Sequence, residues 1–90
     1  MTVKRKRAYI IRVDGSVQDL DHQPTLEEAQ KIVGGYIELV RSTLDSNKTL
    51  VVNEEGRLLG FKPNMLASNL YIHSLVLGDV IVLEGWKSVK

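Results

Sequence analysis

The sequence predicts an α+β fold in which a mostly antiparallel sheet carries two helices. Three observations predict this class: short runs rich in β-branched residues, glycine-containing turns between some of these runs, and two segments of helical spacing that begin at capping residues. In chain order the predicted elements are ββαβββαβ. We expect both helices to pack on one face of the sheet.

The first two strands are predicted to form a hairpin. Residues 8–13 are rich in β-branched and aromatic side chains, and they lead into Asp14 and Gly15, a pair that suits the positive φ angles of a type I′ turn. The return strand, residues 16–21, contains only two apolar side chains. We therefore expect it to be a short, polar strand at an edge of the sheet.

A helix is predicted between Thr25 and Gly34. Thr25 and Glu28 form a capping-box pattern, in which the side chain of each residue bonds the backbone amide of the other. Apolar residues recur after them at the spacing of one helical face, and the pair Gly34 and Gly35 suits a left-handed helix terminus.

Three strands are predicted to follow this helix. Residues 36–41 alternate in polarity, which is typical of a strand with a buried face. Residues 49–52 and residues 57–61 flank a turn at residues 53–56, so we expect them to form a second hairpin.

A second helix and a central strand complete the predicted domain. Asn64 can cap a helix over residues 65–71, in which Leu66 and Leu70 are i, i+4 partners. Residues 80–83 are apolar at both alternating positions, which indicates a strand buried on both faces. We therefore predict a single domain over residues 8–84, a basic arm over residues 1–7 and a tail over residues 85–90.

Composition limits the chemistry that this chain can perform. Its 90 residues are 43% hydrophobic and 26% charged, as in soluble globular domains. The absence of cysteine excludes disulfides, thiolate metal sites and cysteine nucleophiles. No apolar run approaches the roughly 20 residues of a membrane helix, and no apolar stretch follows the basic start as in a secretory signal. We expect a cytoplasmic protein that does not contact membranes.

Charge is unevenly distributed although its formal total is only +1. Residues 1–12 contain five basic and no acidic side chains, whereas residues 13–30 contain five acidic and no basic ones. Clustered cations can bind a nucleic-acid backbone by releasing its counterions, but such binders usually have a clear net positive charge. The arm is therefore either a solubilising start to a strand or a phosphate-contacting element made of Lys4, Arg5, Lys6, Arg7 and Arg12.

Candidate catalytic groups are few. His22 and His73 are the only histidines, and neither belongs to a motif. His22 with Asp19 and Asp21 could bind a divalent ion weakly, but this group resembles a solvated acidic loop more than a metal cage. We expect no catalytic residue, no metal site and no cofactor.

The C-terminal tail contains the only tryptophan, Trp86, next to Lys87. This pair could stack a nucleic-acid base or anchor a partner. Trp86 could equally cover the open end of a small core. Both interpretations remain open at this point.

Four segments taken together resemble a family of small domains of unknown function found in bacteriophages, plasmids, large DNA viruses of algae and bacteria. The resemblance covers about residues 8–84. It is carried by residues 34–38 (GGYIE), residues 51–56 (VVNEEG), Pro63-Asn64 with Ala67 and Leu70, and residues 78–83 (GDVIVL).

This resemblance implies a binder more than a metabolic enzyme, because the family has no established catalytic residues. Asn53 and Asn64 are the matching polar positions that could contact a ligand or partner. Alternatively, Asn53 opens a turn and Asn64 caps a helix. The first half of the predicted order, a hairpin followed by a helix and a strand, also resembles β-grasp domains, which concerns fold alone.

The sequence thus predicts a non-enzymatic accessory binding protein of viral or mobile-element origin, which acts on a host protein or a small ligand in the cytoplasm. The alternative is a nucleic-acid-binding protein that uses the basic arm. A third hypothesis is a homo-oligomer that forms through the exposed edge of residues 16–21.

Overall fold

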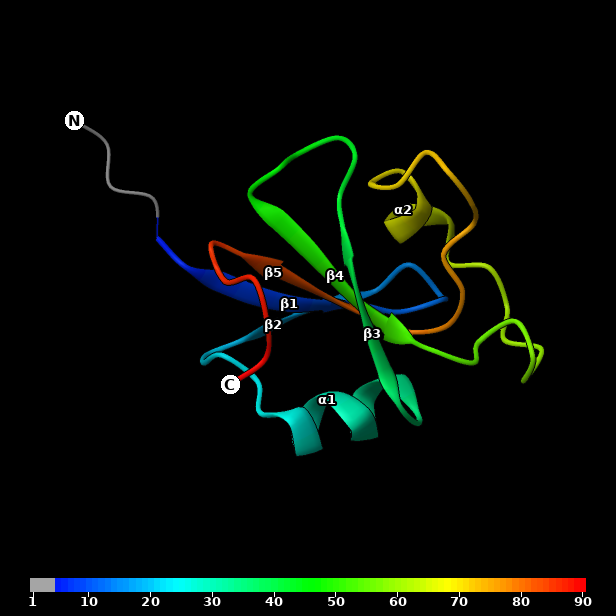
Figure 1. Cartoon of the computed structure of the whole chain (residues 1–90), viewed down its shortest axis with the longest axis horizontal. Helices are drawn as coiled ribbons and strands as arrows, with labels where there is room; N and C mark the ends of the chain where they lie inside the picture. The colour runs from blue at the N-terminus through cyan, green and yellow to red at the C-terminus, as the bar shows by residue number, and fades with distance from the viewer. Residues whose placement is uncertain (1–4) are drawn as a thin grey trace.

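A computed structural model describes residues 5–90, in which five strands form one sheet with a helix on each side of it (Figure 1). The strand order is β2-β1-β5-β4-β3, and every neighbouring pair is antiparallel. The α+β class with a mostly antiparallel sheet is therefore confirmed. The elements are β1 (Arg7–Ile11), β2 (Val17–Leu20), α1 (Leu26–Val33), β3 (Ile37–Arg41), β4 (Lys48–Asn53), α2 (Met65–Ser68) and β5 (Val80–Glu84).

The last strand, β5, lies at the centre of the sheet between β1 and β4. The side chains from Val80 to Leu83 are fully buried, which confirms the central strand predicted from their uniform apolarity. β2 is an edge strand and is exposed over most of its length, as its polar sequence predicts.

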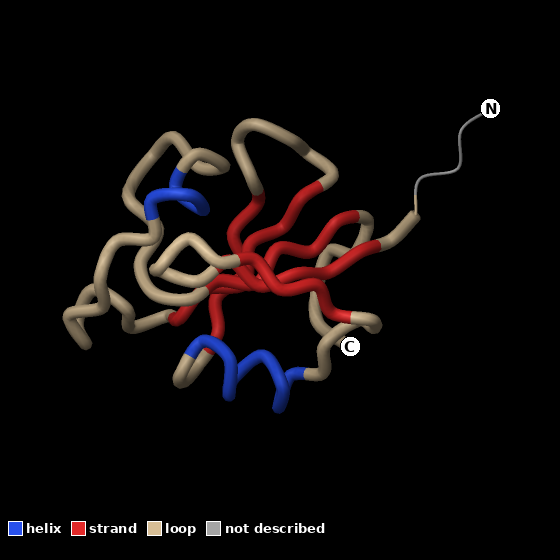
Figure 2. Tube along the Cα trace, turned by 180° about the vertical axis from the view of Figure 1, so that it is seen from behind, coloured by secondary structure: helices blue, strands red, loops and turns tan. Residues whose placement is uncertain are grey.

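The two helices lie on opposite faces of the sheet, so the prediction that both pack on one face is wrong (Figure 2). Alternate residues of β5 explain the difference. Ile81 and Leu83 pack in the cluster that contains α1, whereas Val80 and Val82 pack with Ala67 of α2. A strand that is apolar on both sides requires cover on both faces of the sheet.

Helix α1 begins and ends at the predicted residues. The Thr25 hydroxyl accepts a hydrogen bond from the Glu28 amide (3.1 Å), and the Glu28 carboxylate accepts one from the Thr25 amide (3.0 Å). Gly34 ends the helix with a φ of 85°, a left-handed conformation that glycine adopts without steric cost. Both capping predictions are confirmed.

The predicted strand at residues 57–61 does not form, so the observed order is ββαββαβ. Backbone bonds in this segment are local: the amides of Leu59 and Phe61 donate to the carbonyls of Glu55 (2.8 Å) and Gly56 (2.9 Å). These bonds make a run of turns, and they occupy the donors that a hairpin ladder requires. The resemblance to β-grasp domains is not confirmed.

Helix α2 is shorter than predicted, because it covers only the first four of residues 65–71. The amides of Leu70 and Tyr71 bond carbonyls three residues earlier, which is the geometry of a tighter final turn. Leu66 is 44% exposed, and Leu70, its predicted i, i+4 partner, lies beyond the end of the helix.

No helix within residues 5–90 has the length and apolar character needed to cross a membrane.

Candidate functional site

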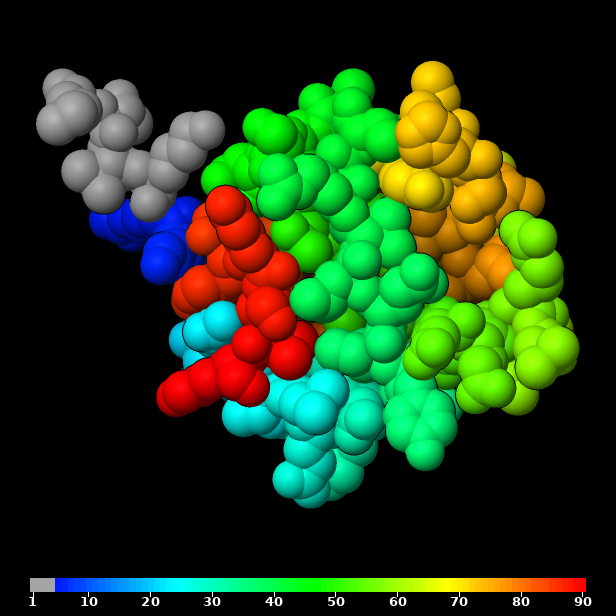
Figure 3. All heavy atoms as spheres, viewed as in Figure 1, coloured from blue at the N-terminus to red at the C-terminus, as the bar shows by residue number. Residues whose placement is uncertain are grey.

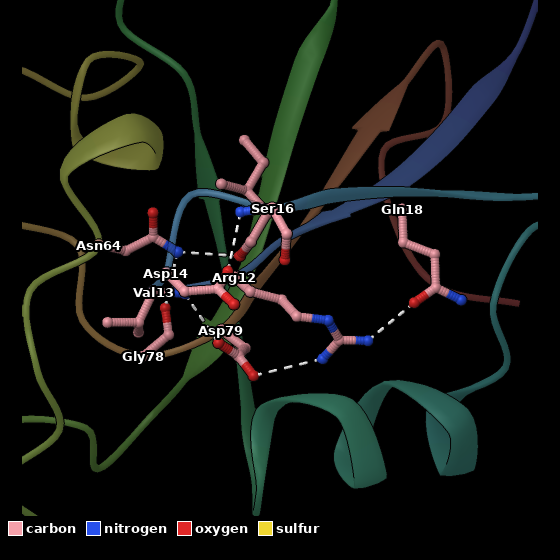
Figure 4. Close-up of polar contacts among 9 residues, drawn as sticks. Arg12, Val13, Asp14, Ser16, Gln18, Asn64, Gly78 and Asp79 are labelled. Atoms are coloured by element: carbon pink, nitrogen blue, oxygen red, sulfur yellow. Dashed lines mark hydrogen bonds and ion pairs between the residues drawn. The ribbon is translucent and has the colours of Figure 1, made fainter.

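The long connection between β4 and β5, residues 54–79, covers the α2 face of the sheet and is anchored by Asn64 (Figure 4). This side chain is fully buried. Its Nδ2 donates to the carbonyls of Ile11 and Gly78 (2.9 Å each), and its Oδ1 accepts from the Ala67 amide (3.0 Å). One amide therefore joins the connection to β1, to α2 and to the start of β5.

A second anchor lies beside it, at the turn between β1 and β2 (Figure 4). The Asp79 carboxylate accepts from the Val13 amide (3.0 Å) and contacts the Arg12 guanidinium (3.5 Å). Arg12 also donates to Gln18 Oε1 (2.8 Å). Arg12, a predicted phosphate contact, thus bonds residues of its own domain.

The middle of the connection is held against the loop after β3. The carbonyl of Leu70 accepts from the Ser42 hydroxyl (2.7 Å) and from the Thr43 amide (3.0 Å). The Ile72 amide donates to the Thr43 hydroxyl (2.9 Å). Residues 54–79 are therefore tied to the sheet at both its ends and along its length.

A cleft of about 260 Å³ lies between this connection and the outer strands β3 and β4. Figure 3 shows the strands in green and the connection from light green to orange on one side of the molecule. Val40 and Val52 belong to the strand side, and Tyr71 and Leu75 belong to the connection. The charged residues that line the cleft are Glu38, Glu54 and Arg57.

A second hollow, of about 340 Å³, lies where α1 ends. The side chains of Ile32 and Phe61 contribute to its lining, together with Lys62 and Asp79. The Phe61 ring packs so close to Gly78 that a methyl group there would lie 2.7 Å from a ring carbon. This hollow is larger than the cleft but more open, so it would enclose less of a ligand's surface.

The connection also exposes many large apolar side chains. Two of them, Leu58 and Ile72, are 83% and 81% exposed. Six of the eleven exposed large apolar residues that the structure describes fall within residues 58–75, although this stretch is only one fifth of the chain. The six are Leu58, Leu59, Met65, Leu66, Ile72 and Leu75.

The basic residues predicted to contact phosphate differ in their surroundings. Lys4 lies outside the described residues, and Arg5 and Lys6 are exposed. Arg7 contacts Asp19 (2.9 Å) and Glu84 (3.4 Å), and the hydrogen bond with Asp19 is the main cause that raises the pKa of its guanidinium. Arg7 and Arg12 thus pair with acidic groups within the domain.

The two predicted asparagines have structural roles. Besides Asn64, Asn53 is buried at the end of β4, where its Nδ2 donates to the Val33 carbonyl (3.1 Å) and its Oδ1 accepts from the Glu55 amide (2.7 Å). Asn53 therefore joins α1 to the turn after β4. Every buried nitrogen and oxygen atom of these two side chains has a hydrogen-bond partner within the described residues, and Asn53 also lines the cleft.

The tail residues Trp86 and Lys87 differ in placement. Trp86 is half-buried and packs with Val89 against the cluster on the α1 face, whereas Lys87 is exposed. Trp86 thus covers the end of the core, which is one of the two interpretations left open above.

The histidines lie apart from the cleft lining. The Nδ1 and Nε2 atoms of His22 contact the carboxylates of Asp21 and Glu28, each at 2.6 Å. The bond with Asp21, followed by that with Glu28, raises the pKa of His22. The ring of His73 packs edge-on against Tyr71 at 5.3 Å. Over residues 5–90, no three His, Asp or Glu side chains gather as a metal site.

The sequence did not predict the cleft. Among its outer residues, Tyr71 ends the stretch predicted as a helix, and Leu75 belongs to a stretch without helical or strand periodicity. A signal was present, because apolar residues in such a stretch are typical of a connection that packs over a core. The sequence does not show which face of the sheet they cover.

A family model described as DUF3846, a domain of unknown function, matches residues 4–88. The chain belongs to the DUF3846 family. The match confirms the resemblance to a family of unknown function, and it extends over part of the arm and most of the tail as well as the sheet. Searches of curated proteins and of solved structures find no match to this DUF3846 domain.

Proposed function

We propose that this DUF3846 domain is a non-enzymatic binding module whose partner is a protein. It docks on a binding face, defined as the cleft between β3, β4 and residues 71–77 together with the exposed apolar side chains of residues 58–75. The observation that carries the proposal is the concentration of exposed apolar residues on a connection that buried hydrogen bonds hold to the sheet. Such patches are typical of interaction sites.

The size of the cleft favours a protein over a small ligand. Pockets that enclose small ligands are usually about 300–1,000 Å³ and cover most of the ligand surface. The cleft measures about 260 Å³ and continues into the exposed surface of the connection. Protein interfaces, by contrast, combine an apolar centre with a polar rim. The apolar strand and connection residues beside Glu38, Glu54 and Arg57 fit that arrangement.

The placement of the histidines supports a role without catalysis. Both ring nitrogens of His22 are engaged by carboxylates, and His73 packs on an aromatic ring. Neither residue lines the cleft. A general base must lie within hydrogen-bond reach of the proton that it removes. His22 lies at the start of α1, and His73 packs on Tyr71 of the binding face but is not among the residues that line the cleft.

The setting of this function follows from the resemblance to proteins of phages, plasmids and algal viruses. On that basis we infer an accessory protein of viral or mobile-element origin, which meets its partner in the cytoplasm of a host cell. The partner would then be a host or viral protein.

Affinity capture with surface variants tests the binding face. Replacing Leu58 and Ile72 together by serine removes two of its most exposed apolar groups without touching the buried core. We expect the captured protein to be lost, with binding weakened at least tenfold. The matched control is the Val17→Ser, Leu26→Ser double variant, because both residues are exposed on other elements. Equal capture by both double variants would contradict the proposal.

Nucleic-acid binding is a second candidate, favoured by the strand register. Arg7 and Lys48 both pair with Glu84 in the sheet, and Lys6 packs beside Gly85, so basic residues far apart in the sequence meet at one end of the sheet. This hypothesis predicts affinity for duplex DNA that falls steeply with salt and drops in the Arg5→Gln, Lys6→Gln variant. Binding that is insensitive to salt, or no binding, would exclude it.

A further inference from the structure

We propose that β3 binds the partner by strand addition, pairing its free edge with an antiparallel extended segment that alternates apolar and basic residues. This inference rests on the proposed function, because it names the kind of segment that binds beside the cleft. Strand addition supplies backbone hydrogen bonds for affinity and pockets for alternate side chains.

The register of β3 shows which of its backbone groups are free. The Tyr36 carbonyl accepts from the Glu54 amide (2.8 Å), and the Ser42 amide donates to the Lys48 carbonyl (3.1 Å). Bonded positions alternate in an antiparallel pair, so even-numbered residues of this stretch face β4. Ile37, Leu39 and Arg41 therefore direct their N–H and C=O groups away from the sheet.

The free edge is short and bounded. β3 is the last strand of the sheet, and within residues 5–90 no hydrogen bond reaches the outward groups of Ile37, Leu39 or Arg41. At the next outward position, Thr43, the amide already bonds the Leu70 carbonyl of the connection. That bond shows that the edge accepts another backbone, and it marks where the open stretch ends.

The residues that line the cleft determine which side chains of an added strand are favoured on the α2 face of the sheet. Glu38 and Val40 of β3 line the cleft, so every second side chain of an added strand lies beside them. Two acidic residues, Glu38 and Glu54, outnumber the single base Arg57 in this lining. Charge complementarity therefore favours basic residues in the set that faces the cleft.

The other set of side chains lies on the α1 face. Its neighbours there are Ile37, which packs against the core, and Leu39, which is 41% exposed. An apolar residue opposite Leu39 would cover its exposed surface, as cross-strand apolar pairs do in a sheet.

A second copy of this chain fits the edge less well than a foreign segment. If two copies of β3 paired in an antiparallel register that keeps both faces aligned, Leu39 would lie opposite its own counterpart. Glu38 would then face Val40 of the second copy, which leaves its carboxylate without an opposite charge. The other edge, β2, is shorter, and its side chains Gln18 and Asp19 are already bonded to Arg12 and Arg7.

Backbone methylation of a synthetic peptide tests the pairing. The probe is an end-capped heptapeptide of alternating lysine and valine, titrated calorimetrically against the full chain. In the proposed register the valine amides point toward β3 and the lysine amides point away. We expect the peptide methylated at its lysine amides to bind like the unmodified one, and the peptide methylated at its valine amides to bind at least tenfold more weakly.

A protein variant gives a second, independent measurement. Leu39→Pro removes one outward donor without removing a bond to β4, and we expect it to weaken binding at least tenfold. Its circular dichroism spectrum checks the fold, and if that variant is unfolded, the methylated peptides still decide the matter because they leave the protein unchanged.

Three outcomes would overturn strand addition: no binding of the unmodified peptide, equal effects of the two methylation patterns, or a larger loss from methylated lysines. If capture of a protein is nevertheless lost in the Leu58, Ile72 variant and retained in its control, the proposed function stands and only the pairing fails.

Discussion

A single buried amide, Asn64, bonds the helix that it caps and two residues that are more distant in the chain. Its side chain bonds the carbonyls of Ile11 and Gly78 and the amide of Ala67. The sequence predicted the last of these bonds, since asparagine before a helix is a common cap. The other two depend on tertiary contacts over 53 and 14 residues of sequence separation, which no local pattern reveals.

Replacing Asn64 by alanine should therefore cost more than the loss of a helix cap. The variant removes three buried hydrogen bonds at once, and we expect the free energy of unfolding to fall by about 3 kcal/mol in urea denaturation. Asn69→Ala, at an exposed amide of the same connection, is the control and should change stability by less than about 0.5 kcal/mol. A loss below about 1 kcal/mol for Asn64→Ala would contradict its anchoring role.

His22 makes the stability of the helix start depend on pH. Hydrogen bonds with Asp21 and Glu28 raise its pKa above the unfolded value of about 6.5. Its stabilising contribution is thus fully present below pH of about 6.5 and is lost as pH rises through the folded pKa. The pKa of Asp21 is lowered by its bond with His22, and that of Glu28 by its bond with the Thr25 backbone, so the contributions of these carboxylates are lost only in acid.

The His22→Gln variant should consequently be more destabilised at pH 5.5 than at pH 9, relative to the unmodified chain. Urea denaturation at the two pH values measures this difference. The same deficit in the free energy of unfolding at both values would show that the charge of His22 does not contribute.

At the scale of elements, some sequence signals that lie within one segment predicted the structure correctly. The capping box of α1, its glycine terminus and the uniform apolarity of β5 are such signals, and the structure confirms all three. The expected strand at residues 57–61 was wrong because its amides bond within the turn and the Phe61 ring packs against Gly34 and Gly78, which are distant in sequence. Side-chain alternation alone cannot distinguish these cases.

Two glycines in left-handed conformations allow the cost of backbone strain to be distinguished from the cost of a packing clash. Gly60 has a φ of 72° and open space around it, whereas Gly78 has a φ of 78° and the Phe61 ring against it. We expect Gly60→Ala to cost about 1 kcal/mol from backbone strain. Gly78→Ala should cost about 3 kcal/mol, because the new methyl group also displaces the ring.

Thermal or chemical denaturation of both glycine variants gives the comparison. Similar losses would mean that the contact between Phe61 and Gly78 adds nothing to the cost of strain.

At the scale of the whole molecule, the sequence predicted the class of fold but not the site. Composition and apolar runs suffice to predict one α+β domain, since they determine how much surface can be buried. The cleft depends on which face of the sheet the connection covers, and the free edge depends on β3 being outermost. Both follow from long-range strand pairing, which is invisible to patterns within one segment.

The basic residues near the N-terminus are less available in the folded molecule than the sequence alone suggests. Arg7 and Arg12, counted in the basic arm, pair with Asp19, Glu84 and Asp79. Two of the five basic residues within residues 1–12 thus form ion pairs within the fold, and one of these pairs joins the acidic segment that follows. The surface that has no cover within the described residues is instead the exposed apolar part of the connection, together with the free edge of β3.

Amide hydrogen exchange at β3 tests the account most directly, because neighbouring residues of one strand give opposite predictions. In the free chain the outward amide of Leu39 should exchange far faster than that of Val40, which bonds β4. Saturation with the lysine–valine heptapeptide should slow Leu39 at least tenfold and leave Gln30 of α1 unchanged. A Leu39 amide that is already protected in the free chain, or that still exchanges fast in the saturated one, would contradict partner binding at this edge.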